Sequence, residues 1–157
     1  MILIKVGTQK SQFNRLLKYV DELVEKGVIT EEVFAQTGAS DYKPAHYAYK
    51  TFMPKPVMEE WNEKADIVIT HGGTASIMES VRLGKKVIAV PRKAEFGEHI
   101  DDHQKEIVQQ LSDGGIIEAC MEVEDLPQAL ENVRTKEYMP YVSNKQAVID
   151  QIREWIG

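Results

Sequence analysis

Short apolar runs alternate along the chain with longer stretches in which apolar residues recur every three or four positions. The short runs are rich in valine and isoleucine, which predicts buried β-strands. These predicted strands cover residues 2–6, 33–37, 67–69, 87–90 and 116–119, with a further short strand near residues 49–52.

The longer stretches have the apolar spacing of helices that bury one face. The first helix is expected to begin with Ser11 as its cap and to end at Gly27, and the second to begin at Pro54 and Pro56. Later helices are expected to begin at Thr74 or Ser76, near His99, at Asp125 and at Asn144.

A strand, a helix and a second strand joined by short turns form a right-handed βαβ unit with parallel strands. The pattern therefore predicts an α/β fold, a Rossmann-like parallel sheet flanked by helices. With 157 residues and no linker or repeat, the chain is expected to form a single domain over residues 1–157.

A glycine turn follows the central predicted strand and leads into a helix. Gly72 and Gly73 carry no Cβ, so the backbone there can approach a ligand closely. The unpaired N–H groups of the helix start favour a phosphate. Thr74 and Ser76 are expected to cap the helix, and Ser76 also offers a hydroxyl to the ligand.

Titratable residues stand on both sides of this turn. His71 ends the strand, which is where open α/β sheets bind ligands, and Glu79 lies one helical turn further on, placed to accept from a sugar diol. Arg92 follows the next strand and would add a cation. The arrangement predicts a phosphate site with a ribose-binding carboxylate beside it.

Other interpretations of the turn stay open at this point. A glycine pair between a strand and a helix also occurs as a plain structural turn. The chain has no G-x-G-x-x-G fingerprint and no Gly-Lys-Ser/Thr phosphate loop, which disfavours a nicotinamide-binding domain and a phosphate-loop enzyme.

The whole pattern resembles a known family. Its residues are His71, Gly73, Ser76 and Glu79, then Gly84, Pro91 and residues 101–104. They look like the donor-binding half of GT-B glycosyltransferases, and most of all like the glycosyltransferase family 28 C-terminal domain. Small stand-alone members are also similar, namely bacterial exopolysaccharide galactosyltransferase subunits and the eukaryotic subunit that adds the second GlcNAc to dolichol-linked sugar. The resemblance covers nearly the whole chain, from residues 6–8 through residues 36–38 to His103 and Gln104.

The resemblance implies roles for further residues. It implies that Phe52 and Met53 lie against the uracil ring of the donor, although Phe52 could equally be a core residue. It also suggests that Gln104, and with it His103, Asp102 and Asp101, sorts hydroxyl groups of the donor sugar. The substrate-binding candidates are therefore Gly7, Thr8, Phe52, Met53, Gly72, Gly73, Thr74, Ser76, Glu79, Arg92, His103 and Gln104.

The catalytic candidates are His71, His99 and Asp102. His99 and His103 are four residues apart, a spacing that could present two imidazoles to a metal, but no third ligand follows at a recognised spacing. We therefore expect no metal site and no cofactor, with the UDP-sugar bound as substrate.

The activity that the resemblance implies is an inverting, metal-independent transfer of galactose or N-acetylglucosamine from a UDP-sugar to a lipid-linked saccharide in exopolysaccharide or glycolipid synthesis. In two-domain relatives the base that deprotonates the acceptor belongs to the other half. A membrane-anchored, acceptor-binding partner subunit is therefore expected. The alternatives are a non-catalytic nucleotide-sugar-binding regulatory subunit and a UDP-sugar epimerase-like protein.

Composition limits the partners and the cellular location that we expect for the chain. The net charge of −6 argues against nucleic acid as a partner, and the single cysteine, Cys120, fits a reducing compartment. No signal peptide or membrane-spanning apolar run is visible, so we expect a cytoplasmic protein that a partner recruits to the inner face of the membrane. The final predicted helix, with Trp155, is either part of the core or the docking face for that partner.

Overall fold

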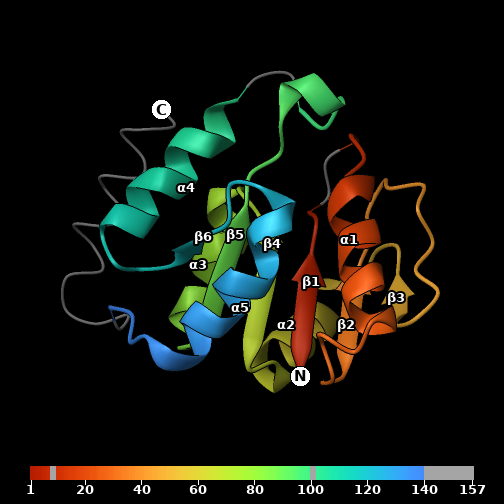
Figure 1. The fold of residues 1–157 in the computed structure, drawn as a ribbon, viewed down its shortest axis with the longest axis horizontal. Coiled ribbons are helices and arrows are strands. Elements are labelled where there is room, and N and C mark those ends of the chain that lie inside the picture. The colour runs from red at the N-terminus through yellow and green to blue at the C-terminus, as the bar shows by residue number, and fades with distance from the viewer. Residues whose placement is uncertain (8–9, 100–101, 140–157) are drawn as a thin grey trace.

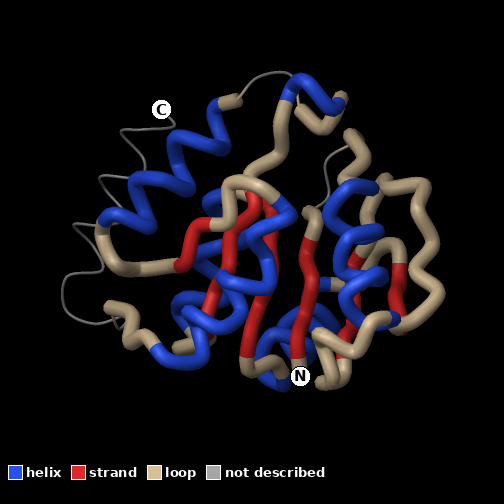
Figure 2. The backbone as a smooth tube through the Cα atoms, viewed as in Figure 1, coloured by secondary structure: helices blue, strands red, loops and turns tan. Residues whose placement is uncertain are grey.

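The computed structural model describes residues 1–7, 10–99 and 102–139. Within them, six parallel strands form one sheet in the order β3-β2-β1-β4-β5-β6. The strands are β1 (Ile2–Lys5), β2 (Val33–Gln36), β3 (Ala48–Lys50), β4 (Ile67–His71), β5 (Lys86–Val90) and β6 (Glu118–Ala119). Figure 2 shows them side by side with the helices around them.

Five α-helices flank the sheet in the described part of the chain, so the predicted α/β class is confirmed. They are α1 (Asn14–Glu25), α2 (Lys55–Lys64), α3 (Thr74–Arg82), α4 (His103–Asp113) and α5 (Leu126–Thr135). Two short 3₁₀ turns, η1 (Ala94–Phe96) and η2 (Val123–Asp125), follow β5 and β6.

The helices cover both faces of the sheet (Figure 1). Helices α1 and α5 share one apolar cluster with Ile2 and Ile4 of β1, whereas α2 packs against Leu3 on the opposite face. Helices α3 and α4 form a third cluster beside β5. Because successive strand residues point to opposite faces, a strand buried on both sides is apolar throughout, as β1 is up to Lys5.

The predicted cap of the first helix is wrong. Helix α1 begins at Asn14 rather than after Ser11, and no side chain caps it by the usual local bond. Its start is held by the Ser40 hydroxyl, which accepts from the N–H of Phe13 at 2.8 Å, and by Gln12, which accepts from Asn14 at 2.8 Å. The helix start is thus held by Gln12 nearby and by Ser40 from a distant loop, and periodicity alone reveals neither contact.

Other boundaries also move. Helix α4 begins at His103 instead of near His99. Asp102 occupies its N-cap position, and the Asp102 side chain accepts from Ala94 in η1 at 3.1 Å. The strand expected at residues 116–119 pairs with β5 only at Glu118 and Ala119, and the strand expected near 49–52 spans Ala48–Lys50. The predicted helix from Asn144, including Trp155, lies outside the described residues.

Helix α2 is attached to the sheet through one aromatic pair. The Trp61 ring stacks on Phe34 of β2 with ring centroids 3.9 Å apart and planes 6° apart. Offset or parallel stacking of this kind adds to the burial of the two rings. The pair therefore helps to hold α2 on the sheet, and the first turn of α2 forms part of the wall of the pocket described below.

Replacing Trp61 with Ala should lower the free energy of unfolding by about 2 kcal/mol, since a large half-buried ring and its stacking partner are lost. Trp61→Phe keeps a ring on Phe34 and should lose less than half as much. Urea unfolding at equilibrium measures both values. Equal losses for the two variants would mean that the stack does not hold α2 in place.

Candidate functional site

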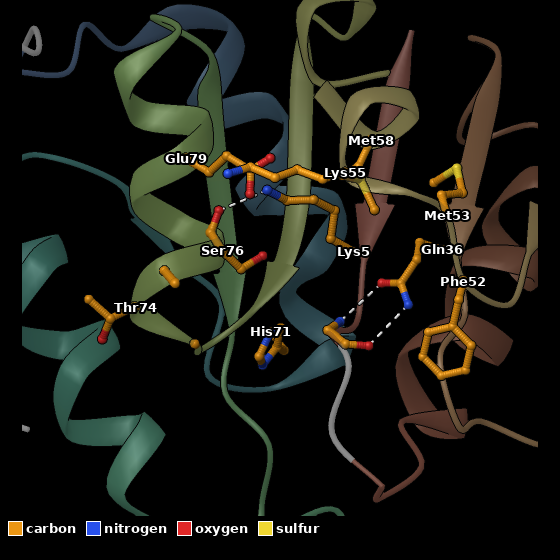
Figure 3. A pocket seen from close by; sticks show the side chains of 13 residues that line it. Lys5, Gln36, Phe52, Met53, Lys55, Met58, His71, Thr74, Ser76 and Glu79 are labelled. Carbon is orange, nitrogen blue, oxygen red and sulfur yellow. Dashed lines mark hydrogen bonds between the residues drawn. The ribbon is translucent and has the colours of Figure 1, made fainter. Parts of the chain in front are cut away.

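A cavity of about 610 Å³ opens at the carboxyl ends of the strands, on the face covered by α2 and α3 (Figure 3). It lies beside β1 and β4, where the chain order reverses from β3-β2-β1 to β4-β5-β6. Such a switch point is where open parallel sheets bind ligands, because the loops on its two sides run in opposite directions. The first turns of α3 form one side of the cavity, and the segment at Phe52 and Met53 forms the other.

His71 fills the space between two glycines at this point. A Cβ on Gly7 would lie 2.5 Å from its Nε2, and a Cβ on Gly73 would lie 2.4 Å from its Cε1. Gly7 also has a φ of +84°, a conformation that favours glycine. The two glycines thus make room for the imidazole as well as for a ligand.

Gln36 holds the Gly7 peptide in this position. Its Oε1 accepts from the Gly7 N–H at 3.1 Å, and its Nε2 donates to the Gly7 carbonyl at 3.0 Å (Figure 3). Gln36 lines the cavity, and sequence reasoning did not name it as a site residue. The available signals were its position at the end of the second strand and the family resemblance, which runs through residues 36–38.

The His71 imidazole is neutral. Burial, followed by the positive charges of Arg92 and Lys5, lowers the pKa of His71 to about 3. Gln104 Nε2 lies 3.3 Å from Nδ1, and an amide nitrogen only donates, so Nδ1 accepts and Nε2 carries the proton. His71 thus has an N–H to offer at the cavity.

Gln104 supports the turn from behind. Its Oε1 accepts from the N–H groups of Gly72 and Arg92, each at 3.1 Å, and its side chain is buried. A Cβ on Gly72 would lie 2.8 Å from the Cβ of Gln104. The predicted contact between Gln104 and a donor sugar is therefore corrected: its side chain faces the protein backbone and His71, not the cavity.

Arg92 is also placed differently from the prediction. It is fully buried, and its guanidinium donates to the carbonyl oxygens of Val6, Ser11, Gln12 and Glu98. It does not line the cavity. An arginine that ties four backbone carbonyls together cannot turn toward a phosphate without leaving them unpaired, so its predicted ligand contact is wrong for this structure.

The start of α3 is open. Gly73 occupies the N-cap position and no side chain caps the helix, which corrects the expected capping by Thr74 or Ser76. The Ser76 hydroxyl lies 2.8 Å from that of Thr70, and both Thr74 and Ser76 line the cavity. The uncapped helix start presents its N–H groups and its partial positive charge to the cavity.

Glu79 and Lys5 bring opposite charges into the same cavity. Glu79 accepts from Asn62 at 2.9 Å through Oε1. Lys5 donates to the Ser76 carbonyl and to the Ser80 hydroxyl, each at 2.8 Å. Burial lowers the pKa of Lys5 to about 8, against the opposing effect of Glu79, so Lys5 carries its charge at neutral pH. Sequence reasoning missed Lys5 because it sits inside an apolar strand.

The remaining candidates separate into two groups. Phe52 is 54% exposed and lines the cavity with Met53, so the alternative that Phe52 is a core residue is wrong. His99, Asp102 and His103 are not on the cavity wall: His103 pairs with Glu106 at 3.3 Å and Asp102 bonds to η1. Thr8 and Asp101 lie outside the described residues.

The part of the chain that the structure describes contains neither a cluster of metal ligands nor a membrane-spanning helix. No group of three or more histidine, cysteine, aspartate or glutamate side chains is placed to hold a metal ion there. Over the same residues, no helix has both the length and the apolar character needed to span a bilayer.

The fold is that of one half of a GT-B glycosyltransferase. Structural similarity is found to the glycotransferase of kitacinnamycin, with a TM-score of 0.62 at 18% identity over 98% of this chain and 37% of that one. MurG of Acinetobacter baumannii gives 0.59 at 20% identity over 98% of this chain and 49% of that one. The solution structure of ALG13 gives 0.63 at 17% identity, over 97% of this chain and 94% of that one.

The sequence comparisons define the family. The family model described as the glycosyltransferase family 28 C-terminal domain matches residues 1–155, and the chain belongs to this family. A curated relative, the UDP-N-acetylglucosamine transferase subunit ALG13 of Candida glabrata, is 33% identical over 79 residues. That match covers 50% of this chain and 38% of the relative's length.

Replacing His71 with Asn tests the neutral imidazole. The unfolded chain protonates His71 near its ordinary pKa of 6.5 and the folded chain only near 3. The folded state therefore keeps its full stability above 6.5 and loses it as the pH falls toward 3. Between pH 7 and pH 5, the wild type should lose about 2 kcal/mol more unfolding free energy than His71→Asn.

Urea unfolding of both proteins at the two pH values provides the measurement. Carboxylate titrations are common to both proteins and cancel in the difference. If the two proteins lost equal stability, His71 would be titrating in the folded state as it does in water.

Proposed function

We propose that this chain is the donor-binding and catalytic part of a glycosyltransferase that moves a hexose from a UDP-sugar to a lipid-linked saccharide. The observation that carries the proposal is the cavity in which the open start of α3, with Ser76, lies one helical turn from the Glu79 carboxylate. Phosphate and diol are the groups that these two features recognise.

The named activity of the relative supports the donor class. The curated relative is called a UDP-N-acetylglucosamine transferase subunit, so N-acetylglucosamine is one donor sugar to test and galactose is the other. The proposed setting is exopolysaccharide or glycolipid synthesis at the cytoplasmic face of a membrane.

Glycosyl transfer builds negative charge on the departing β-phosphate. In our proposal the backbone N–H groups after Gly73, the partial charge of the α3 start and the Ser76 hydroxyl stabilise that charge. Lys5 adds a full positive charge beneath the first turn of α3, through its bond to the Ser76 carbonyl. Arg92 has no part in this account because it is committed to the backbone.

His71 acts as a neutral hydrogen-bond donor in this proposal, and not as a base. Its proton sits on Nε2 and its low pKa leaves it a very weak base in the folded state. A donor N–H at the end of β4 suits a phosphate oxygen or the leaving oxygen. The general base that accepts the acceptor's proton would then come from a partner subunit.

The transfer is proposed to be inverting and independent of divalent metal. Fixed backbone dipoles and the Lys5 ammonium would supply the charge stabilisation that a metal ion gives in other transferases. UDP affinity measured by calorimetry with and without EDTA should then be unchanged.

Glu79→Ala tests the site directly. The variant should bind UDP about 10- to 100-fold more weakly, because a charge-assisted bond to the ribose diol is lost. Its affinity for 2′,3′-dideoxy-UDP should change far less, since that ligand has no diol. Calorimetric titration with both ligands gives the comparison.

An equal loss for both ligands would assign Glu79 another role. Absence of UDP binding by the folded wild-type chain would overturn the proposed function itself. Circular dichroism of the variant serves as the folding control.

The partner subunit is tested by transfer assays. The purified chain should bind UDP-sugar yet transfer nothing, and adding membranes that carry the acceptor-binding subunit should restore turnover. Efficient transfer by the purified chain to a lipid-linked acceptor would refute the two-component proposal. Donor binding without turnover in the presence of that subunit would point to a regulatory role instead.

A further inference from the structure

Glu79 is held by only one of its two carboxylate oxygens. Oε1 accepts from the side-chain amide of Asn62 at 2.9 Å. Among the described residues, no hydrogen bond reaches Oε2, and the side chain lines the cavity. One oxygen is thus anchored to the protein, and the carboxylate belongs to a side chain on the cavity wall.

The anchor continues into the protein. Asn62 Oδ1 accepts from the hydroxyl of Ser80 at 2.8 Å, and that hydroxyl accepts from the Lys5 ammonium at 2.8 Å. Asn62 Nδ2 also donates to the Met58 carbonyl at 3.0 Å, which fixes the orientation of the amide. The chain joins β1, α3 and α2 and ends on the Glu79 carboxylate.

The direction of donation along this chain is settled by its ends. An ammonium only donates and a carboxylate only accepts, so Lys5 donates to Ser80, Ser80 to Asn62 and Asn62 to Glu79. Each link polarises the next in the same sense. The Lys5 ammonium therefore polarises the hydrogen bond to the Glu79 carboxylate through Ser80 and Asn62.

Asn62 and Ser80 do not line the ligand space, whereas Lys5 is also one of the residues of the cavity wall. Asn62 and Ser80 are fully buried and are absent from the cavity wall, and Lys5 is 3% exposed. Burying a lysine in a strand is unfavourable unless its charge has a partner. In the described chain Lys5 and Glu79 form no direct ion pair, so the hydrogen-bonded chain is the connection between them.

We infer that Lys5, Ser80 and Asn62 are positioning residues that aim the Glu79 carboxylate at a vicinal diol of the ligand, so that together they set the preference of the pocket for ribonucleotides. The inference rests on the proposed function, because it takes the ligand to be a nucleoside diphosphate with a ribose. It concerns selectivity for the diol and not the binding of the diphosphate.

The test uses UDP and 2′,3′-dideoxy-UDP as calorimetric probes of the full chain at neutral pH. Ser80→Ala breaks the chain in a position where alanine favours the helix. Its UDP affinity should fall about five- to tenfold, as expected for a lost hydrogen bond, while its affinity for the dideoxy ligand stays within about twofold. Lys5→Met removes the same chain at its charged end and should reduce the affinity ratio in the same direction.

Tyr47→Phe is the matched control. Tyr47 donates to the Leu17 carbonyl at 2.9 Å on the other face of the sheet, so this variant also loses one hydroxyl hydrogen bond. It should lower stability and leave the ratio of the two affinities unchanged. A merely structural role of Ser80 would give the same outcome as Tyr47→Phe.

The possible outcomes separate the two proposals. A folded Ser80→Ala variant with the wild-type ratio overturns the positioning role while the proposed function stands. If Ser80→Ala does not fold, the ratio in Asn62→Ala decides the matter, because Asn62 bonds Glu79 without lining the cavity. A wild-type chain that binds UDP and the dideoxy ligand equally well also overturns the inference, and one that binds neither overturns the proposed function.

Discussion

The imidazole of His71 occupies the space that side chains at positions 7 and 73 would fill. The pocket depends on this packing of one ring against two glycines. Gly7 follows β1 and Gly73 precedes α3, so the ring separates the ends of two neighbouring strands at the switch point. Any Cβ at either position would displace the ring, the turn or both. The glycines are therefore required by packing within the protein before any ligand is considered.

The surroundings of His71 depend in turn on two buried cations. Arg92 ties backbone carbonyls of the segments after β1 and β5 together, and its charge helps to lower the pKa of His71. Lys5 acts on His71 in the same direction from β1. A ring kept neutral beside two cations remains a hydrogen-bond donor without adding a third positive charge, so the positive charge in the cavity comes from Lys5, Lys55 and the helix start.

Periodicity identified the strands and the faces of the helices because the local pattern and the tertiary burial agree. It also placed His71, Gly73, Ser76 and Glu79 in one pocket, since a strand end and the first turns of the next helix are adjacent by chain connection. Contacts made across the sheet were beyond its reach. Arg92 follows a strand in the sequence exactly as a ligand residue would, yet its guanidinium turns inward to carbonyls up to 86 positions away.

Lys5 and Gln104 also show that local sequence does not predict whether a side chain faces the cavity. Lys5 has the sequence context of a core residue and lies in the cavity, because strand pairing sets it beside Thr70 and beneath α3. Gln104 has the context of a sugar-binding residue and supports the glycine turn instead. Which way such a side chain faces depends on register and on neighbours from other elements, and neither is encoded within a short window of sequence.

Helix α3 sets the distance between the two recognition features of the pocket. Its open start and Glu79 belong to one rigid helix, and three residues of helix separate Ser76 from Glu79 by about 4.5 Å along the axis. A diphosphate and the ribose diol of the same nucleotide must then be reached without any hinge between them. The side chain of Glu79 can still rotate relative to the helix, and its hydrogen bond to Asn62, which Ser80 supports, restricts that rotation. In the proposed function, selectivity for the diol therefore depends on Asn62 and Ser80 behind Glu79, whereas phosphate binding depends on the backbone N–H groups at the start of α3 together with Ser76 and Lys5.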